Sequence, residues 1–184
     1  MCHYQSRLTL NHWVLPTWLS ERGGWLAEDA LGAWRRYLAW LVPALAPAVD
    51  LWVTLNEPMV PVLAGYLAAY HPPCRTRPLE AAKVFRKLLE AHVIAYGTIH
   101  SLIDRAPDGS SPQAGCAGAY QLVEPFHDRG FSRPLEKVVS GIIAQTSFRA
   151  WDESVVTGCV AWPWGMGGRI PDLQGSVDFV GVNY

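Results

Sequence analysis

The segment Leu51–Pro58, which reads LWVTLNEP, constrains the fold of this chain more than any other stretch. From position 49 to position 56, aliphatic side chains occupy every second place, which predicts a β-strand with two distinct faces. Pro58 has no N–H to continue a central ladder, so the strand must stop there. Because proline disfavours the helical region for the preceding residue, we expect an extended backbone at Glu57. Glu57 is therefore predicted to lie at the C-terminal end of a strand, where parallel α/β barrels carry catalytic groups.

Three more segments are predicted to be strands: residues 7–15, 114–123 and 177–184. Predicted helices separate them, so neighbouring strands should be parallel. The helical segments begin near Glu28, span Leu79–Ile103 with Pro78 in the first turn, and span Pro134–Trp151. The pattern is typical of an α/β protein in which the long connections after the strands build the binding pocket.

The first of these helices carries apolar residues at helical spacing, at positions 31, 34, 38 and 41. These residues should face the sheet. We interpret both Trp34 and Trp40 as packing residues. Pro43 follows within the same segment, and it predicts a kink or an early end of the helix.

Composition excludes several classes of partner. Half of the 184 residues are hydrophobic and 17% are charged, which suits a well-buried globular domain. A net charge of −1 gives no electrostatic basis for binding nucleic acid or an anionic membrane. The longest apolar runs are short or interrupted, as by Pro43 and Pro47, so none is expected to span a bilayer.

The cysteines and histidines predict no cofactor or metal. Cys2, Cys74, Cys116 and Cys159 lie far apart without a C-x-x-C pair, so we expect free thiols instead of disulfides or a zinc site. His71 is near Cys74 but lacks a second pair of ligands. No basic stretch followed by an apolar segment is visible at the N-terminus, so we expect a cytoplasmic protein.

Three motifs resemble a known family. WVTLNEP resembles the signature around the acid/base carboxylate of glycoside hydrolase family 1, the retaining β-glycosidases. LTLNHWVLPTWL resembles the third strand of the family's barrel, and VDFVGVNY resembles its sixth, which reads D-F-x-G-x-N-Y-Y. The resemblance implies that residues 1–184 form a single incomplete domain, a partial TIM (β/α)8 barrel with about strands 3 to 6 of eight. A full barrel needs about 250 residues.

The resemblance also implies roles for five residues. Glu57 would be the acid/base that protonates the leaving oxygen, and Asn56 would bind the sugar 2-hydroxyl. His12 and Trp13 would lie in the subsite for the non-reducing sugar, the glycone, and Asn183 would face the site. All five lie toward the C-terminal ends of predicted strands, so we expect them to cluster at one end of the sheet.

The family's nucleophile lies in a Thr-Glu-Asn-Gly segment, and this sequence contains none. One hypothesis is a fragment of a retaining β-glycosidase, acting on β-glucosides or β-galactosides when whole and inactive alone. The alternative is a non-catalytic carbohydrate-binding or interaction module derived from the same fold. In either case the open edges of an incomplete barrel predict self-association.

Overall fold

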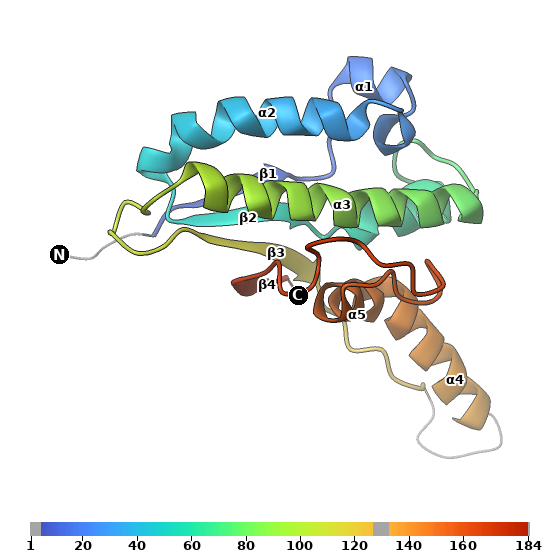
Figure 1. The fold of residues 1–184 in the computed structure, drawn as a ribbon. Coiled ribbons are helices and arrows are strands. Elements are labelled where there is room, and N and C mark those ends of the chain that lie inside the picture. The colour runs from blue at the N-terminus through green and yellow to red at the C-terminus, as the bar shows by residue number, and fades with distance from the viewer. Residues whose placement is uncertain (1–4, 127–132, 184) are drawn as a thin grey trace.

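The computed structural model describes residues 5–126 and 133–183 of the chain. Its centre is one parallel sheet in which each strand pairs with the next along the chain (Figure 1). The strands are β1 (Arg7–Asn11), β2 (Leu51–Asn56), β3 (Gln113–Ala119) and β4 (Phe179–Asn183). The predicted parallel α/β arrangement is confirmed. The end of the fourth predicted strand, Tyr184, lies outside the described residues.

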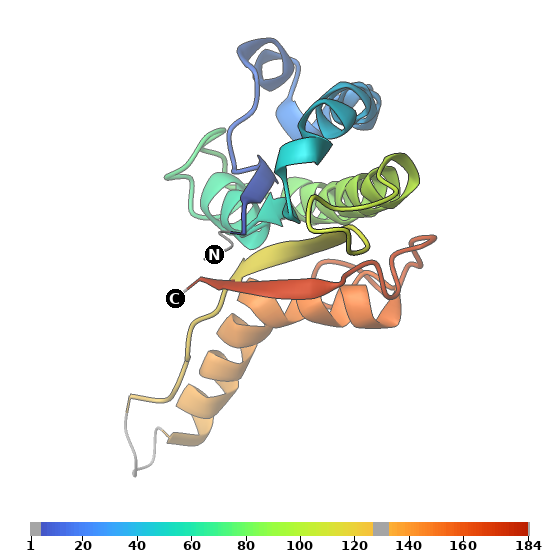
Figure 2. The same ribbon diagram turned by 90° about the vertical axis from the view of Figure 1, so that its left-hand side faces the viewer.

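The helices belong to the connections between strands. They are α1 (Thr17–Glu21), α2 (Ala30–Leu45), α3 (Pro78–Leu102), α4 (Arg133–Ala144) and α5 (Ala150–Thr157), with the short turns η1 (Gly24–Leu26) and η2 (Ala46–Ala48) and the π-helical segments η3 (Pro61–Gly65) and η4 (Gln145–Arg149). Figure 2 shows α2, α3 and α5 on the same side of the sheet. No helix in the described ranges is both long and apolar enough to cross a membrane.

The core lies between the sheet and helix α3. Phe85, Leu88 and Leu89 of α3 are completely or almost completely buried, as is Trp52 of β2. The ring of Phe85 meets the edge of Trp151 from α5, with 6.1 Å between their centres. Burial of such large side chains contributes about 1.5–3 kcal/mol each, so α3 is the main support of the sheet.

Helix α2 corrects one prediction. Trp40 is 71% exposed and does not pack, because Trp34, Leu38 and Val42 form the buried face and Trp40 lies on the other side of the helix. Pro43 lies inside α2, and the helix ends soon after it, at Leu45. Pro43 is in the last turn on the exposed face, where water can replace the N–H that proline lacks.

Two strands end earlier than the sequence pattern predicts. Strand β1 stops at Asn11 instead of residue 15, because its neighbour β2 ends at Asn56 and offers no further ladder partner. Strand β3 stops at Ala119 instead of residue 123. The pairing partner therefore sets the length of β1.

The predicted helix over residues 134–151 is divided into α4, η4 and α5. Helix α4 projects away from the rest of the molecule (Figure 1). Its apolar residues at spacing i, i+3, i+4, i+7 and i+8 are all 45–68% exposed: Leu135, Val138, Val139, Ile142 and Ile143. This apolar face of α4 therefore packs against nothing within the described part of the chain. On β4, Val180 and Val182 are also more than half exposed, so the sheet has an uncovered apolar margin.

A buried histidine connects three parts of the fold. The Nδ1 atom of His92 lies 2.6 Å from the Thr54 hydroxyl of β2, and its Nε2 lies 2.8 Å from the Ser176 carbonyl. Desolvation by burial lowers the pKa of His92 to about 4, so the ring is neutral at pH 7. In the neutral ring, Nε2–H donates to Ser176 and Nδ1 accepts from Thr54. His92 thus holds α3 against β2 and the segment before β4.

We predict that His92 makes the stability of the chain depend on pH. The unfolded histidine titrates near pH 6.5 and the folded one near pH 4, so the unfolded chain binds the additional proton between these values. The stabilisation is complete above about pH 6.5 and falls by roughly 3 kcal/mol as the pH approaches 4. Urea unfolding at several pH values measures this dependence.

His92→Gln should flatten that dependence between pH 6.5 and 4, although the variant is less stable overall. His71→Gln is the matched control, because the ring nitrogen of His71 contacts only the adjacent Pro72 carbonyl in the described part of the chain. An unchanged slope in His92→Gln would contradict the prediction.

Candidate active site

The sequence-predicted site residues lie together at the C-terminal edge of the sheet. Asn56 is the last residue of β2, Glu57 follows it, and Asn183 is the last residue of β4. His12 and Trp13 follow the end of β1. In parallel α/β barrels this edge carries the catalytic groups.

A chain of hydrogen bonds links four of these side chains. The amide of Asn183 donates to Glu57 Oε1 at 2.7 Å and to Asn56 Oδ1 at 3.0 Å. The amide of Asn56 lies 3.1 Å from His12 Nε2. Since an amide N–H donates, His12 Nε2 accepts. No residue within 5–126 or 133–183 accepts from its Nδ1–H, which can therefore donate to a ligand. Residues from three strand ends are therefore held in one network.

The small residues of β3 permit this network. Strand β3 lies between β2 and β4, yet the side chains of Asn56 and Asn183 meet across it. Their partners in the ladder are Ala117 and Ala119, which do not reach far enough to separate them. At Gly115 a Cβ atom would lie only 2.1 Å from the Phe179 carbonyl oxygen, so this position also excludes a side chain.

Trp13 is fixed by contacts on two sides. Its indole N–H donates to the Asn56 carbonyl at 3.0 Å, and its ring meets the edges of His12 and His71 at 5.0 and 5.8 Å between centres. The φ angle of Trp13 is 69°, in the left-handed region that non-glycine residues rarely adopt. Strain of this kind clusters at functional sites, so the conformation fits a residue placed for binding.

The backbone of Glu57 is a correction to the sequence prediction. It is left-handed, with a φ of 44°, instead of extended. The Glu57 N–H donates to the Ala117 carbonyl of β3 at 2.6 Å, and its carbonyl accepts from Val60 N–H at 2.9 Å. These two bonds hold the turn at the strand end, and they outweigh the local preference that Pro58 imposes.

Glu57 lines a pocket that was not predicted from the sequence. The pocket lies between the strand ends and the helical run of η4 and α5, and its wall includes Tyr120 and Asp152. Tyr120 directly follows β3, as Glu57 follows β2. Its position at a strand end could therefore have indicated from the sequence that Tyr120 belongs to the site. Asp152 lies on a helix and had no such signal. Among the described residues, no cluster of three or more His, Cys, Asp or Glu side chains could hold a metal ion.

A comparison with known families identifies the class of protein to which this chain belongs. The family model of glycosyl hydrolase family 1 matches residues 2–140, which is most of the chain. The chain therefore belongs to glycosyl hydrolase family 1.

Several relatives are similar in sequence or structure. A β-galactosidase of Pyrococcus woesei is 31% identical over 125 residues, which are 60% of this chain and 24% of the relative. An aryl-phospho-β-D-glucosidase of Bacillus subtilis, BglC, is 28% identical over 99% of this chain and 39% of its own length. The solved β-glycosidase of Pyrococcus horikoshii superposes with a TM-score of 0.82 and 30% identity, covering 98% of this chain and 38% of that one.

The chain thus spans less than half the length of these relatives. A family 1 β-glucosidase of Thermotoga maritima, at 22% identity and a TM-score of 0.80, shares the fold. The incomplete TIM barrel predicted from sequence is confirmed. The roles of Glu57, Asn56, His12, Trp13 and Asn183 stay predictions.

Proposed function

We propose that this chain supplies the general acid/base and part of the glycone subsite of a retaining β-glycosidase that hydrolyses O-β-glycosidic bonds in β-glucosides or β-galactosides. The observation that carries the proposal is the contact of Glu57 with the Asn183 amide, within the same network as Asn56 and His12. The network orients a carboxyl group at the edge of an open pocket. Membership of glycosyl hydrolase family 1 supports the reaction class.

Retaining glycosidases place two carboxyl groups about 5–5.5 Å apart, one as the nucleophile and one as the acid/base. Glu57 would protonate the leaving oxygen and then activate water. Asn56 has a second N–H and a second lone pair beyond its contacts with the protein, and these would bind the sugar 2-hydroxyl in the transition state. The free Nδ1–H of His12 and the ring of Trp13 would contact the sugar ring.

The first prediction concerns Glu57 and uses glucoimidazole, a glucose-shaped compound whose imidazole nitrogen accepts a proton from an acid beside the glycosidic position. We expect the purified chain to bind glucoimidazole, and Glu57→Gln to weaken that binding about tenfold because a charge-assisted hydrogen bond is lost. Calorimetric or NMR titration measures the dissociation constant.

Glu124→Gln is the matched control, since Glu124 also precedes a proline but is exposed and outside the pocket. Its affinity should equal that of the wild type. Equal binding by wild type and Glu57→Gln, with loss in Trp13→Ala, would favour the alternative of a non-catalytic carbohydrate-binding module. Absence of binding in all variants would contradict both hypotheses.

The second prediction is that the chain alone does not hydrolyse an aryl β-glucoside. General acid assistance contributes about 10²–10⁴-fold, and the enzymatic acceleration of such reactions is far larger. Wild type and Glu57→Gln should both remain at the background rate in a chromogenic assay. Turnover that Glu57→Gln abolishes would show that another residue of this chain acts as the nucleophile.

We also infer that this chain associates with further copies of itself. Strands β1 and β4 are both at edges of the sheet, and unpaired edges template pairing with another chain. The apolar face of α4 and the exposed valines of β4 add apolar surface, and its exposure to water is unfavourable.

Sedimentation velocity should therefore show species heavier than the 20.4 kDa chain, increasing with protein concentration. The double substitution Val138→Lys with Ile142→Lys places charges on the exposed face of α4 and should reduce association. Lys137→Glu, on an exposed polar position of α4, controls for a change of charge alone. A wild-type chain that stays monomeric at all concentrations would overturn this inference.

A further inference from the structure

The charged residues that line the pocket beside Glu57 are all acidic. The pocket is formed by the segment after β2, the end of β3 and the helical run of η4 and α5. Its polar lining residues are Glu57, Tyr70, Tyr120, Gln121, Ser147 and Asp152. Two of them are acidic and none is lysine, arginine or histidine. The pocket therefore favours a neutral or cationic ligand over an anion.

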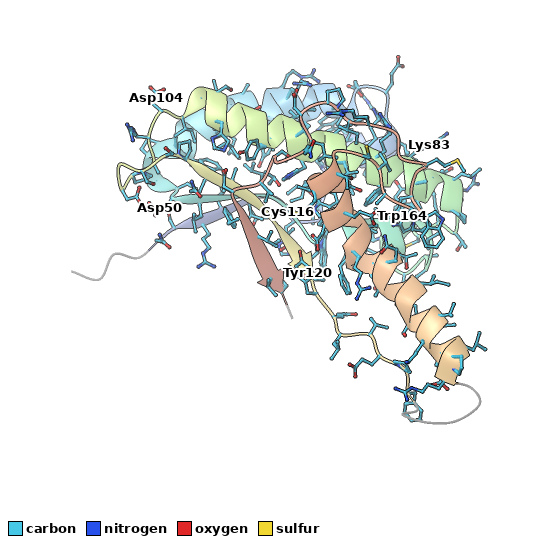
Figure 3. The ribbon with its side chains drawn as sticks, turned by 60° about the horizontal axis from the view of Figure 1, so that its bottom comes forward. Asp50, Lys83, Asp104, Cys116, Tyr120 and Trp164 are labelled. Carbon is cyan, nitrogen blue, oxygen red and sulfur yellow. The ribbon has the colours of Figure 1, made fainter. Side chains whose placement is uncertain are left out.

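Asp152 is the second acid of this pocket. Tyr120 donates its hydroxyl hydrogen to Asp152 Oδ1 at 2.9 Å (Figure 3 shows Tyr120 where β3 ends). Within residues 5–126 and 133–183, Asp152 has no ion pair, and Tyr120 is its only side-chain hydrogen-bond partner. The remaining oxygen, Oδ2, is free to accept a hydrogen bond from a ligand.

Burial raises the pKa of the Asp152 carboxyl, and the hydrogen bond from Tyr120 opposes that rise. A cationic ligand stabilises a carboxylate more strongly when that carboxylate is partly desolvated and lacks another cation than when the carboxylate lies in open water. Glu57 cannot provide this partner, because a carboxyl group carries no positive charge in either protonation state. A positively charged group on a ligand would therefore stabilise the Asp152 carboxylate.

Aromatic rings form the other walls. Tyr120 and Phe148 lie 5.7 Å apart between ring centres at an angle of 54°, and Trp151 and Tyr70 complete the lining. Flat aromatic groups pack well against such rings, and the negative ring faces also attract cations. The pocket therefore combines surfaces for a planar ligand with an acceptor for its polar end.

We propose that this pocket binds a planar aromatic leaving group that carries an ammonium group, and that Asp152 selects it by accepting a hydrogen bond at Oδ2. The proposal rests on the proposed function, since it places the leaving group of the β-glycoside next to Glu57. Tyr120 is a positioning residue: its hydroxyl holds Asp152 Oδ1 and turns Oδ2 toward the ligand. A leaving group with a hydroxyl in place of the ammonium makes the same bond without the charge, and one with a carboxylate is rejected.

Three compounds with the same phenol ring and a short side chain test this selection: tyramine, which ends in an ammonium; tyrosol, which ends in a hydroxyl; and 3-(4-hydroxyphenyl)propionate, which ends in a carboxylate. NMR titration of the whole chain gives the dissociation constants. We expect tyramine to bind about tenfold more tightly than the carboxylate, with tyrosol between them, since the charged contact is only partly buried.

Asp152→Asn should remove the advantage of tyramine over tyrosol. The matched control is Glu153→Gln, which removes the same charge from the next residue, an exposed one outside the pocket. It should retain the wild-type order. Tyr120→Phe keeps the ring and the carboxylate but removes the bond that positions Oδ2, so it should reduce the preference for tyramine over the propionate without abolishing it. This variant tests the role of Asp152 if Asp152→Asn does not fold, and a full wild-type preference in it would overturn the positioning role of Tyr120.

Equal affinity of the three compounds in the wild type would overturn the proposal. An equal loss in Asp152→Asn and Glu153→Gln would also overturn it, because the preference would then reflect net charge alone. Failure here is distinguishable from failure of the proposed function. Glucoimidazole binding depends on Glu57, whereas the tyramine preference depends on Asp152.

Discussion

The small side chains of β3 are the constraint on which the candidate active site depends. A large residue at Ala117 or Ala119 would separate Asn56 from Asn183, although the backbone ladder could still form. The hydrogen bonds that join the ends of β2 and β4 exist only because the strand between them leaves space above the sheet. Packing in one strand therefore decides polar chemistry on its two neighbours.

The part of the sheet farther from the candidate active site is held by other contacts. The neutral ring of His92 connects α3, β2 and the segment before β4, and it does so in a site from which water is excluded. Further toward the C-terminal end of α3, Tyr96 and His100 both contact Asp178, which also accepts from Ala114 N–H. Together these contacts fix β4 against β3 and so determine where Asn183 lies.

The site divides its chemistry between two surfaces. On one side, His12, Trp13 and Asn56 offer hydrogen-bond donors, acceptors and an aromatic ring, which suits a sugar. On the other side, Asp152 and its aromatic neighbours offer a flat apolar wall with one acceptor. Glu57 lies between these surfaces, since it accepts from the Asn183 amide and also lines the pocket that holds Asp152. The relatives in glycosyl hydrolase family 1 are much longer than this chain.

The sequence by itself determined the parallel α/β arrangement, the end of β2 before Pro58 and the helix that begins at Pro78, since proline geometry and apolar spacing act locally. Only the tertiary structure decided where β1 ends, because a strand continues only while a neighbour pairs with it. It also decided the left-handed backbone of Glu57, which an inter-strand bond to Ala117 imposes against the local preference. The approach of Asp152 to Tyr120 joins residues far apart in the chain, and no local pattern encodes such a contact.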